Sequence, residues 1–464
     1  MSFLTRDWRY GPLPRKIETM RIVIIGNGIA GSTAARYLRK RADHELIMIS
    51  GESAHPFSRT ALMYMYMGHL RYQDTKLYED FFWSKNRIQL LQDWVTKVDT
   101  ATKTVHLSQS APLSFDKLIL ATGSHSNRFD WPGQDLQGVQ GLYSLQDLAA
   151  LEEWSASTRQ AVVVGGGLIG IELAEMLQSR GIHVTMLVRE DNYWDNVLPK
   201  EEAQLIDRHI EAHQVDLRLS TQLQRIVGDE EGRVKEVVTD GGEVIPCQWV
   251  GLAVGVHPNA ALAQSMGLAC NKGVLVDDYL QTSHPDIYAI GDCAELRQPP
   301  PGRKAIEPVW YTGKLMGKTV ARTLATTPTP YRPGIWYNSA KFFDIEYQVY
   351  GTIPSRPAAE NTLLWQDARQ WQSIRLHFTA APPHALQGIN VLGVRIRHDV
   401  ADKMIREAWP LSKVMTHWAA LYFDPEMSRS LTPALLDAYR ERFPDAPIVP
   451  KKKRQLRDLL FFKP

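Results

Sequence analysis

Short apolar runs and a glycine-rich turn follow one another near the amino terminus. Residues 21–25 (RIVII) form a β-branched run that predicts a buried strand. The glycine-rich segment 26–31 (GNGIAG) comes next, and residues 32–41 have the pattern of a helix. A second apolar run, 45–49, ends shortly before Glu52. The order strand, glycine turn, helix and strand is typical of a dinucleotide-binding unit.

The same order of elements occurs again in the middle of the chain. Residues 161–164 (AVVV) lead into the glycine-rich segment 165–170 (GGGLIG), a helical pattern over 171–180 and a strand over 183–188. One such turn is a weak signal, because glycine turns between strands and helices are common. Two copies in the same context predict an α/β chain with two Rossmann-like dinucleotide-binding domains.

The spacing of the glycines has a physical reason. Gly26 permits the tight turn, Gly28 lets backbone amides approach a pyrophosphate, and Gly31 lets the helix pack closely on the sheet. Glu52 lies about 20 residues past the turn, where its carboxylate can accept hydrogen bonds from a ribose. The second unit has its glycines at the corresponding positions, Gly165, Gly167 and Gly170.

Composition narrows the class of protein. A chain of 464 residues, 44% of them hydrophobic, is expected to fold as two or three domains. Lys and Arg number 53 against 51 Asp and Glu, a net charge of +2, so no basic field attracts nucleic acid. The amino terminus lacks the apolar core of a secretory signal, and no apolar run approaches the roughly 20 residues of a membrane span. The chain is therefore expected to be cytoplasmic.

Two further segments, 115–124 (FDKLILATGS) and 282–295 (TSHPDIYAIGDCAE), each predict a strand that ends in a turn of small residues. Together with the twin glycine turns, they make residues 20–420 resemble the pyridine nucleotide-disulfide oxidoreductase superfamily. The resemblance implies a homodimer that binds FAD and NAD(P)H. It implies an amino-terminal extension (1–20), an FAD domain (21–124 and 258–330), an NAD(P)H domain (125–257), an α+β interface domain (331–425) and a carboxyl-terminal helical tail (426–464).

The resemblance also implies roles for single residues. It places Arg59 near the FAD pyrophosphate and Asp292 at the ribityl and phosphate region of FAD. Glu172 is placed where the nicotinamide meets the flavin, and relatives put a lysine beside this glutamate where the present chain has Tyr64. Glu172 and Tyr64 are therefore the catalytic candidates, and Glu172 is expected to bond to an amide or to Tyr64. The other implied cofactor-binding residues are Ala30, Ala121, Thr122, Gly123, Leu168, Ile169, Gly255, Gly291 and Trp310, the last of which could instead fill a domain interface.

A missing thiol separates this chain from the disulfide reductases of the superfamily. Those enzymes carry a C-x-x-x-x-C pair, and single-cysteine relatives resemble S-x-x-C-A-L-P-Y, whereas residues 58–64 read SRTALMY with Thr60 in the place of the thiol. A threonine hydroxyl forms no thiolate or sulfenic acid. Cys293 follows Asp292 and is expected to be structural. The three cysteines, Cys247, Cys270 and Cys293, have no C-x-x-C spacing, which favours reduced thiols and no metal site. Without a redox-active thiol, electrons are expected to leave the flavin directly.

The S-R-x-x-L pattern resembles the cysteine-free branch, which includes ferredoxin and rubredoxin reductases, the flavin part of nitrite reductases and the apoptosis-inducing-factor type. The first hypothesis is therefore an NAD(P)H oxidoreductase whose acceptor is a small redox protein such as ferredoxin or rubredoxin. A quinone or oxygen reductase and a flavoprotein redox sensor stay open. The basic and apolar tail 451–462 (KKKRQLRDLLFF) motivates the quinone alternative through peripheral membrane contact, although docking on the protein itself is the simpler interpretation.

The choice between NADH and NADPH depends on the end of the second unit. An acid at this position favours NAD by bonding the ribose, while arginine accommodates the phosphate of NADP. Arg189 resembles one of the two arginines by which glutathione-reductase-like enzymes select NADPH, but a second arginine is missing and Glu190 would repel a phosphate. The balance favours NADPH by a small margin, and NADH stays open.

Overall fold

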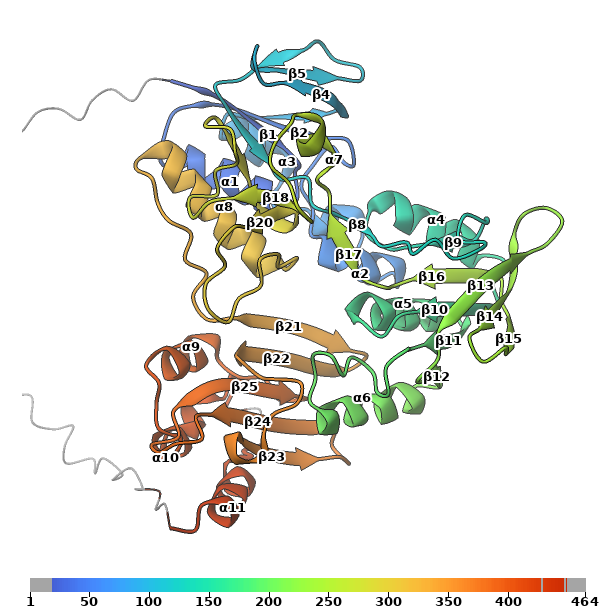
Figure 1. Cartoon of the computed structure of the whole chain (residues 1–464), viewed down its shortest axis with the longest axis vertical. Coiled ribbons are helices and arrows are strands. Elements are labelled where there is room, and N and C mark those ends of the chain that lie inside the picture. Colours follow the sequence, from blue (N-terminus) through green and yellow to red (C-terminus); the bar gives the residue numbers. More distant parts are fainter. Residues whose placement is uncertain (1–18, 427–428, 446–447, 449–464) are drawn as a thin grey trace, which may run out of the picture.

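Three five-stranded sheets form the framework of the protein (Figure 1). The structure is a computed structural model that describes residues 19–426, 429–445 and 448. The expectations for most of the amino-terminal extension and for the basic and apolar tail 451–462 lie outside the described residues. Among the described residues, no helix is long and apolar enough to cross a membrane.

The first sheet is parallel and has the strand order β19-β7-β1-β2-β3. Its central strand is the first predicted apolar run, and Ile22, Val23 and Ile24 are fully buried. Helix α1 (Ile29–Arg39) leaves the glycine turn, and helix α8 (Trp310–Ala325) packs across it. The strands are β1 (Arg21–Ile25), β2 (Glu45–Ser50), β3 (Ile88–Gln92), β7 (Lys117–Leu120) and β19 (Ile287–Ala289).

The second sheet repeats this plan with the strand order β12-β11-β10-β16-β9, again parallel. Helices α4 (Leu145–Ser155), α5 (Leu168–Ser179) and α6 (Lys200–Ala212) accompany it. Its strands are β9 (Val139–Gln140), β10 (Gln160–Val164), β11 (His183–Leu187), β12 (Asp216–Arg218) and β16 (Trp249–Leu252). A separate antiparallel sheet consists of β13 (Leu223–Gly228), β14 (Val234–Thr239) and β15 (Val244–Pro246).

The third sheet is antiparallel, with the order β21-β22-β25-β24-β23. The strands are β21 (Tyr337–Phe342), β22 (Ile345–Gly351), β23 (Thr362–Asp367), β24 (Gln372–Phe378) and β25 (Leu386–Leu392). The accompanying helices are α9 (His398–Arg406), α10 (Leu411–Thr416) and α11 (Thr432–Arg442). The mixed architecture, two parallel α/β sheets followed by an α+β unit, confirms the predicted fold class.

Two short antiparallel strands, β8 (Ser124–Ser126) and β17 (Val256–Pro258), carry the chain from the first sheet to the second and back. Helix α2 (Leu62–Tyr66) lies between two strands of the first sheet in the sequence but contacts α4 and α5 of the second unit. It therefore bridges the same two units. The remaining elements are short: α3 (Asp80–Lys85), α7 (Ala261–Ser265), β4 (Val95–Asp99), β5 (Thr104–Leu107), β6 (Leu113–Ser114), β18 (Val274–Val276) and β20 (Ala294–Leu296), with 3-10 turns at Arg59–Ala61, Tyr72–Thr75, Gly291–Cys293, Ala359–Asn361 and Trp418–Leu421.

The two helices after the glycine turns begin three residues earlier than the apolar pattern predicts. They start at Ile29 and Leu168, whereas residues 32–41 and 171–180 were expected to be helical. The reason is that the third glycine of each turn lies inside the first turn of its helix, where a larger side chain would meet the backbone behind it. The glycine-rich segments therefore belong partly to the helices.

A buried ion pair fastens the third sheet to the second unit. The guanidinium of Arg375 on β24 donates to both carboxylate oxygens of Glu202 on α6, at 2.6 and 2.7 Å. The same guanidinium reaches Glu201 at 2.7 Å, but Glu201 is 53% exposed whereas Arg375 and Glu202 are buried. Removing one partner of a buried pair leaves an uncompensated charge, which costs more than losing an exposed pair.

The two neighbouring glutamates provide a matched test of this fastening. We expect Glu202→Gln to lower the free energy of unfolding by about 3–5 kcal/mol, because the charge of Arg375 stays buried. Glu201→Gln should cost less than about 1 kcal/mol. Urea denaturation followed by tryptophan fluorescence measures both free energies of unfolding. Equal losses for the two variants would show that the buried pair stabilises the fold no more than the exposed pair does.

Candidate dinucleotide sites and the electron path

The first glycine turn is shaped by backbone contacts. Gly26 has φ +110°, and a Cβ atom there would lie 2.1 Å from the carbonyl oxygen of Ala121. A Cβ atom at Gly31 would lie 2.0 Å from the carbonyl oxygen of Gly26. Gly28 differs, since nothing lies within 4 Å of its Cβ position. The first and third glycines let strand and helix touch, and the middle one leaves open space at the amino end of α1.

The second turn repeats these contacts nearly atom for atom. A Cβ atom at Gly165 (φ +119°) would lie 2.4 Å from the carbonyl oxygen of Ala253, and one at Gly170 would lie 2.3 Å from that of Gly165. At Gly167 the nearest atom, the same Ala253 oxygen, is 4.0 Å away. Both open spaces face the amino end of a helix, where backbone N–H groups bind phosphate. The two turns therefore fit the pyrophosphates of two dinucleotides.

A chain of polar contacts leads away from the first turn. The guanidinium of Arg59 donates to both oxygens of Glu52, at 2.9 and 2.5 Å, and also to the carbonyl oxygen of Tyr143. The hydroxyl of Tyr143 in turn donates to Asp292 at 3.3 Å. The structure thus joins Glu52 and Arg59, which the sequence assigned to different parts of FAD. Burial raises the pKa of both Tyr143 and Asp292.

Within this series of polar contacts, Tyr143 is the residue that the sequence did not predict. It belongs to the segment expected to bind NAD(P)H, yet its ring lies 4.3 Å from the guanidinium carbon of Arg59 in the first unit. The backbone N–H of Ser124 donates to its hydroxyl at 2.9 Å. A Cβ atom at Gly123 would come within 2.7 Å of that hydroxyl. No motif around Tyr143 signals this role, because the contacts form only when the two units meet.

Small residues line the passage between the two units. The hydroxyl of Thr122 donates to the carbonyl oxygen of Asn259 at 2.7 Å, which ties the outgoing chain to the returning one. Gly255, with φ +89°, accepts a hydrogen bond from the backbone N–H of Asn127 at 3.0 Å. At the end of β19, a Cβ atom at Gly291 would lie 2.9 Å from the Cβ of Ala30, so the Asp292 turn rests directly on α1.

Glu172 lies on α5, one turn after the second glycine turn. Burial raises its pKa to about 7, and the nearby charge of Glu175 acts in the same direction. Glu172 has no hydrogen-bond partner among the described residues, so the bond to Tyr64 that the sequence analysis allowed is not formed. The nearby lysine of the third sheet, Lys341 on β21, pairs with Glu175 at 2.9 Å instead. Sequence analysis missed Lys341 because it comes from the third sheet.

Leu168 and Ile169 begin α5 and are half-buried against its core. The carbonyl oxygen of Gly167, just before them, accepts a hydrogen bond from the hydroxyl of Tyr193 at 2.7 Å. Arg189 and Glu190 follow β11, and their side chains pair at 2.7 Å. Arg189 is 71% exposed while Glu190 is mostly covered. Glu190 therefore lies just beyond the end of β11, and the guanidinium of Arg189 already forms an ion pair with it.

Burial raises the pKa of all three cysteine thiols. Cys293 is fully buried, its Sγ donates to the carbonyl oxygens of Leu120 and Ile290, and burial raises its pKa. Burial raises the pKa of Cys247 to about 12 and also raises that of Cys270. Thr60 is exposed, and its hydroxyl lies 3.0 Å from that of Ser58. None of these positions offers a thiolate for electron transfer.

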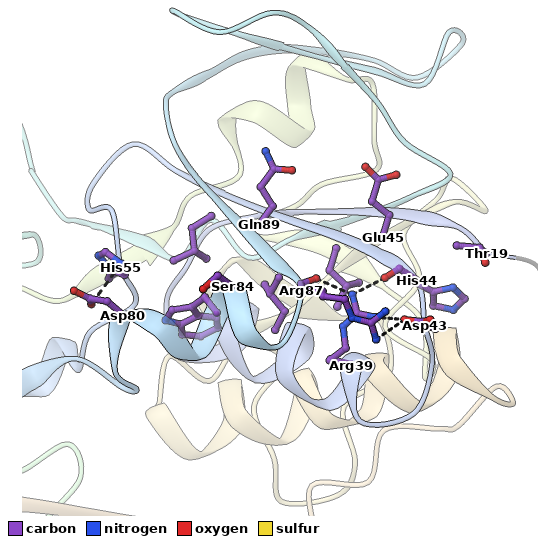
Figure 2. A pocket seen from close by; sticks show the side chains of 14 residues that line it. Thr19, Arg39, Asp43, His44, Glu45, His55, Asp80, Ser84, Arg87 and Gln89 are labelled. Carbon is purple, nitrogen blue, oxygen red and sulfur yellow. Dashed lines mark hydrogen bonds and ion pairs between the residues drawn. The ribbon is translucent and has the colours of Figure 1, made fainter.

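Two cavities lie elsewhere. One of about 710 Å³ is lined by Arg39, Asp43, His44 and residues of α3 and β3, at the start of the first sheet's strands and away from the glycine turn (Figure 2). Its charges pair internally, as Asp43 does with Arg39 and Arg87. The other, of about 340 Å³, lies between α8 and the third sheet, where Trp310 meets Lys314, Lys318 and Arg395. Trp310 therefore lines a surface groove.

The chain matches a known family and several known proteins. The family model for pyridine nucleotide-disulphide oxidoreductases matches residues 20–317. The chain is 33% identical to the nitrite reductase [NAD(P)H] of Bacillus subtilis over 64% of its own length, but spans only 37% of that protein. It is 30% identical to the rubredoxin-NAD(+) reductase of Ectopseudomonas oleovorans, covering 68% of this chain and 83% of the relative. A ferredoxin reductase from Rhodopseudomonas palustris shares the fold, with a TM-score of 0.73, 24% identity and coverage of 80% and 91%.

Because Gly28 has open space at its Cβ position and Gly31 does not, substitutions at these two glycines should affect cofactor binding and folding separately. We expect Gly28→Ala to leave the stability of the flavin-free protein within about 1 kcal/mol of wild type, since Gly→Ala at ordinary φ is mildly stabilising, while flavin content falls because a methyl group enters the phosphate space. Gly31→Ala should instead fail to reach the native fold. Flavin absorbance per chain and thermal melting distinguish the two, and full flavin content in Gly28→Ala would contradict the assignment.

Glu172 should make stability depend on pH. A carboxyl whose pKa rises on folding from 4.5 to about 7 binds its proton more tightly in the native state. Its contribution is then complete below pH 4.5 and is lost as the pH rises to about 7. Glu172→Gln should match wild type at pH 4 and exceed it at pH 8 in melting temperature. Glu153→Gln, at an exposed position of α4, serves as the control and should track wild type throughout.

Proposed function

Since the chain belongs to the pyridine nucleotide-disulphide oxidoreductase family, we propose that it is an FAD-dependent enzyme that takes electrons from NADH or NADPH and passes them to a small redox protein of the ferredoxin or rubredoxin kind. The observation that carries this proposal is the pair of glycine turns with matching contacts, each at the carboxyl end of a parallel strand. Two dinucleotides require two such turns. The names of the relatives support the choice of acceptor.

The first unit is proposed to hold FAD and the second NAD(P)H. Gly26, Gly28 and Gly31 would accommodate the FAD pyrophosphate, with Arg59 inside the polar chain beside it and Asp292 at the end of that chain. Bound FAD supplies the redox chemistry, which is hydride uptake from a nicotinamide and release of electrons to an acceptor. The protein contributes position and exclusion of water. Glu172, with a pKa near neutrality and no described partner, is free to hydrogen-bond a nicotinamide amide in either protonation state.

NADH is proposed as the preferred donor. Glu190 stands at the end of β11, where an acid bonds the ribose hydroxyls of NAD. Arg189, the residue that favoured NADPH, is paired with Glu190 and largely exposed. A phosphate approaching this strand end would therefore meet a guanidinium whose charge is already paired with the Glu190 carboxylate. This revises the small preference for NADPH drawn from the sequence.

Direct delivery of electrons is supported by the placement of the thiols. Cys293 is buried against β7, and the resemblance puts Thr60 at the position that a redox-active cysteine takes in other members of the superfamily. The groove of about 340 Å³ beside Trp310 is the proposed exit, because Lys314, Lys318 and Arg395 give it positive charge. Such a surface attracts an acidic partner and accelerates its association. A homodimer stays a prediction that rests on the resemblance, and a cytoplasmic location stays one that rests on the apolar pattern of the sequence.

Rapid-mixing experiments test the proposed function. We expect NADH to bleach the flavin faster than NADPH does, and an added ferredoxin or rubredoxin to reoxidise it. Lys314→Glu and Lys318→Glu together should lower the second-order rate of reoxidation by roughly 10-fold at low salt, without changing reduction by NADH. The exposed Lys272→Glu is the control. Reduced flavin that no redox protein discharges would overturn the proposal and favour a sensor role.

A further inference from the structure

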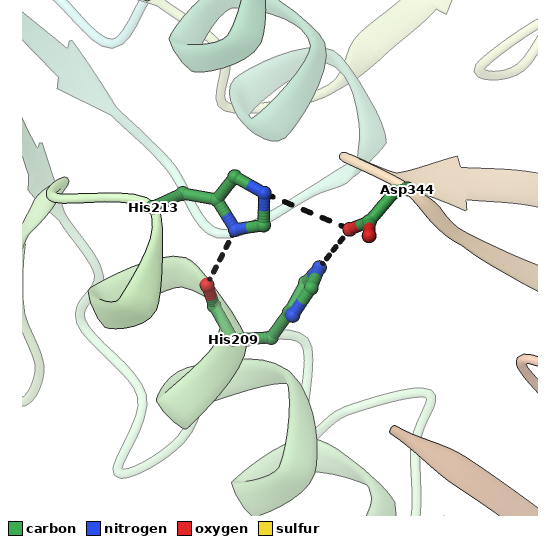
Figure 3. A group of neighbouring side chains, drawn as sticks. All are labelled: His209, His213 and Asp344. Carbon is green, nitrogen blue, oxygen red and sulfur yellow. Dashed lines mark hydrogen bonds and ion pairs between the residues drawn. The ribbon is translucent and has the colours of Figure 1, made fainter. Parts of the chain in front are cut away.

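Three metal-ligating side chains converge where the second unit meets the third sheet (Figure 3). His209 lies in the last turn of α6, His213 follows one turn later, and Asp344 occupies the tight turn between β21 and β22. The Nε2 atoms of His209 and His213 lie 2.7 and 3.6 Å from Oδ1 of Asp344. One donor atom from each residue falls within 4.8 Å of both others.

The orientation of His213 favours a cation between these groups. Its Nδ1 lies 2.9 Å from the carbonyl oxygen of His209. A carbonyl can only accept, so Nδ1 carries the hydrogen and donates it. In the neutral ring, Nε2 then presents a lone pair toward the Asp344 carboxylate. Two acceptors that face each other need a proton or a metal ion between them, and a backbone carbonyl on the second nitrogen is the usual anchor of metal-bound histidine.

His209 is the buried member of the group. It is only 2% exposed, and in the described part of the chain neither of its ring nitrogens makes a hydrogen bond of ordinary geometry, although Nε2 lies 2.7 Å from Oδ1 of Asp344. Aromatic rings hold both imidazoles in place: Trp371 lies 4.8 Å from the ring of His209, and Phe343 stacks on His213 at 4.2 Å and 12°. The donor atoms are thus positioned before any ion arrives, which reduces the cost of binding.

We propose that His209, His213 and Asp344 bind a divalent transition-metal ion with the ligand preference of Zn²⁺. Two imidazoles and one carboxylate are a donor set that suits zinc. Tetrahedral bonds of about 2.0–2.1 Å place ligand atoms about 3.3 Å apart, a spacing that lies between the two measured separations. His213 is 34% exposed and Asp344 is 74% exposed, so the fourth position opens to solvent and takes water.

The ion would join two domains. Two of its ligands come from the carboxyl end of α6, where His213 directly follows the helix. The third comes from the β21–β22 turn, whose neighbour Lys341 already pairs with Glu175 on α5. Because the site forms only in the folded chain, binding stabilises that state by mass action. The number and spacing of the cysteines could not predict this site, because none of its ligands is a cysteine. It is independent of the redox proposal, because none of its ligands belongs to either glycine turn.

Zinc titration of the flavin-loaded, tag-free full-length protein, stripped of metal by a chelator, tests the site. We expect one Zn²⁺ per chain by calorimetry and by elemental analysis after dialysis, a higher melting temperature with Zn²⁺, and no comparable effect of Mg²⁺, which prefers oxygen ligands. His213→Gln and Asp344→Asn should each weaken Zn²⁺ binding by more than the roughly 10–100-fold that loss of an outer-shell partner costs.

His183→Gln provides the matched control, because His183 is an exposed histidine of the same unit, at the start of β11. It should bind Zn²⁺ and respond in melting temperature like wild type. If wild type binds no more Zn²⁺ than the double variant His213→Gln/Asp344→Asn, the group is an ion-pair cluster only. If all variants bind equally, the metal sits elsewhere. Either result overturns the proposal, and neither changes the expected reduction by NADH.

Discussion

The contact between the third glycine of each turn and the carbonyl oxygen of the first sets the geometry on which the rest of the structure depends. At Gly31 and Gly170 a Cβ atom would come within 2.0 and 2.3 Å of that oxygen, far inside van der Waals distance. The helix can therefore begin directly at the end of its strand. Its free N–H groups then face the open position in front of the middle glycine, where a phosphate can approach.

A second close approach extends this arrangement to the far part of the chain. Gly313 and Gly317 let α8 lie against α1, since a Cβ atom at Gly317 would come within 2.6 Å of the carbonyl oxygen of Ala30. The amino end of α8, with Trp310, is thereby fixed near the start of α1. The Asp292 turn rests on the same alanine. Residues that are about 260 to 290 positions apart thus meet at one helix end. This explains why the first glycine turn and the distant Asp292 turn belong to the same predicted dinucleotide site.

The sequence predicts those parts of the protein that depend on local pattern. The fold class, the family and the two cofactors were confirmed, because strand, glycine turn and helix are encoded within about 30 residues. The helix starts were wrong by three residues, since a glycine was taken as turn rather than helix. Tyr143, Lys341 and the His209 cluster could not be predicted, because each acquires its neighbours from another domain. The pairing of Arg59 with Glu52 likewise depends on how the loop after β2 folds back.

The third sheet is attached differently to its two neighbours, and this difference shapes the groove proposed for electron exit. It is bound to the second unit by the buried pair of Arg375 and Glu202, by Lys341 and by aromatic packing of Phe342 on Tyr193. Toward α8 it leaves the groove that Trp310 lines. One wall of the groove therefore belongs to the first unit, while the other is held by contacts to the second. Tyr311 of α8 bridges the two walls, since its ring lies 4.7 Å from that of Tyr337 on β21 and its hydroxyl lies 2.9 Å from that of Ser339. The acceptor proposed to bind in this groove would therefore contact a surface that α8 and the third sheet form together.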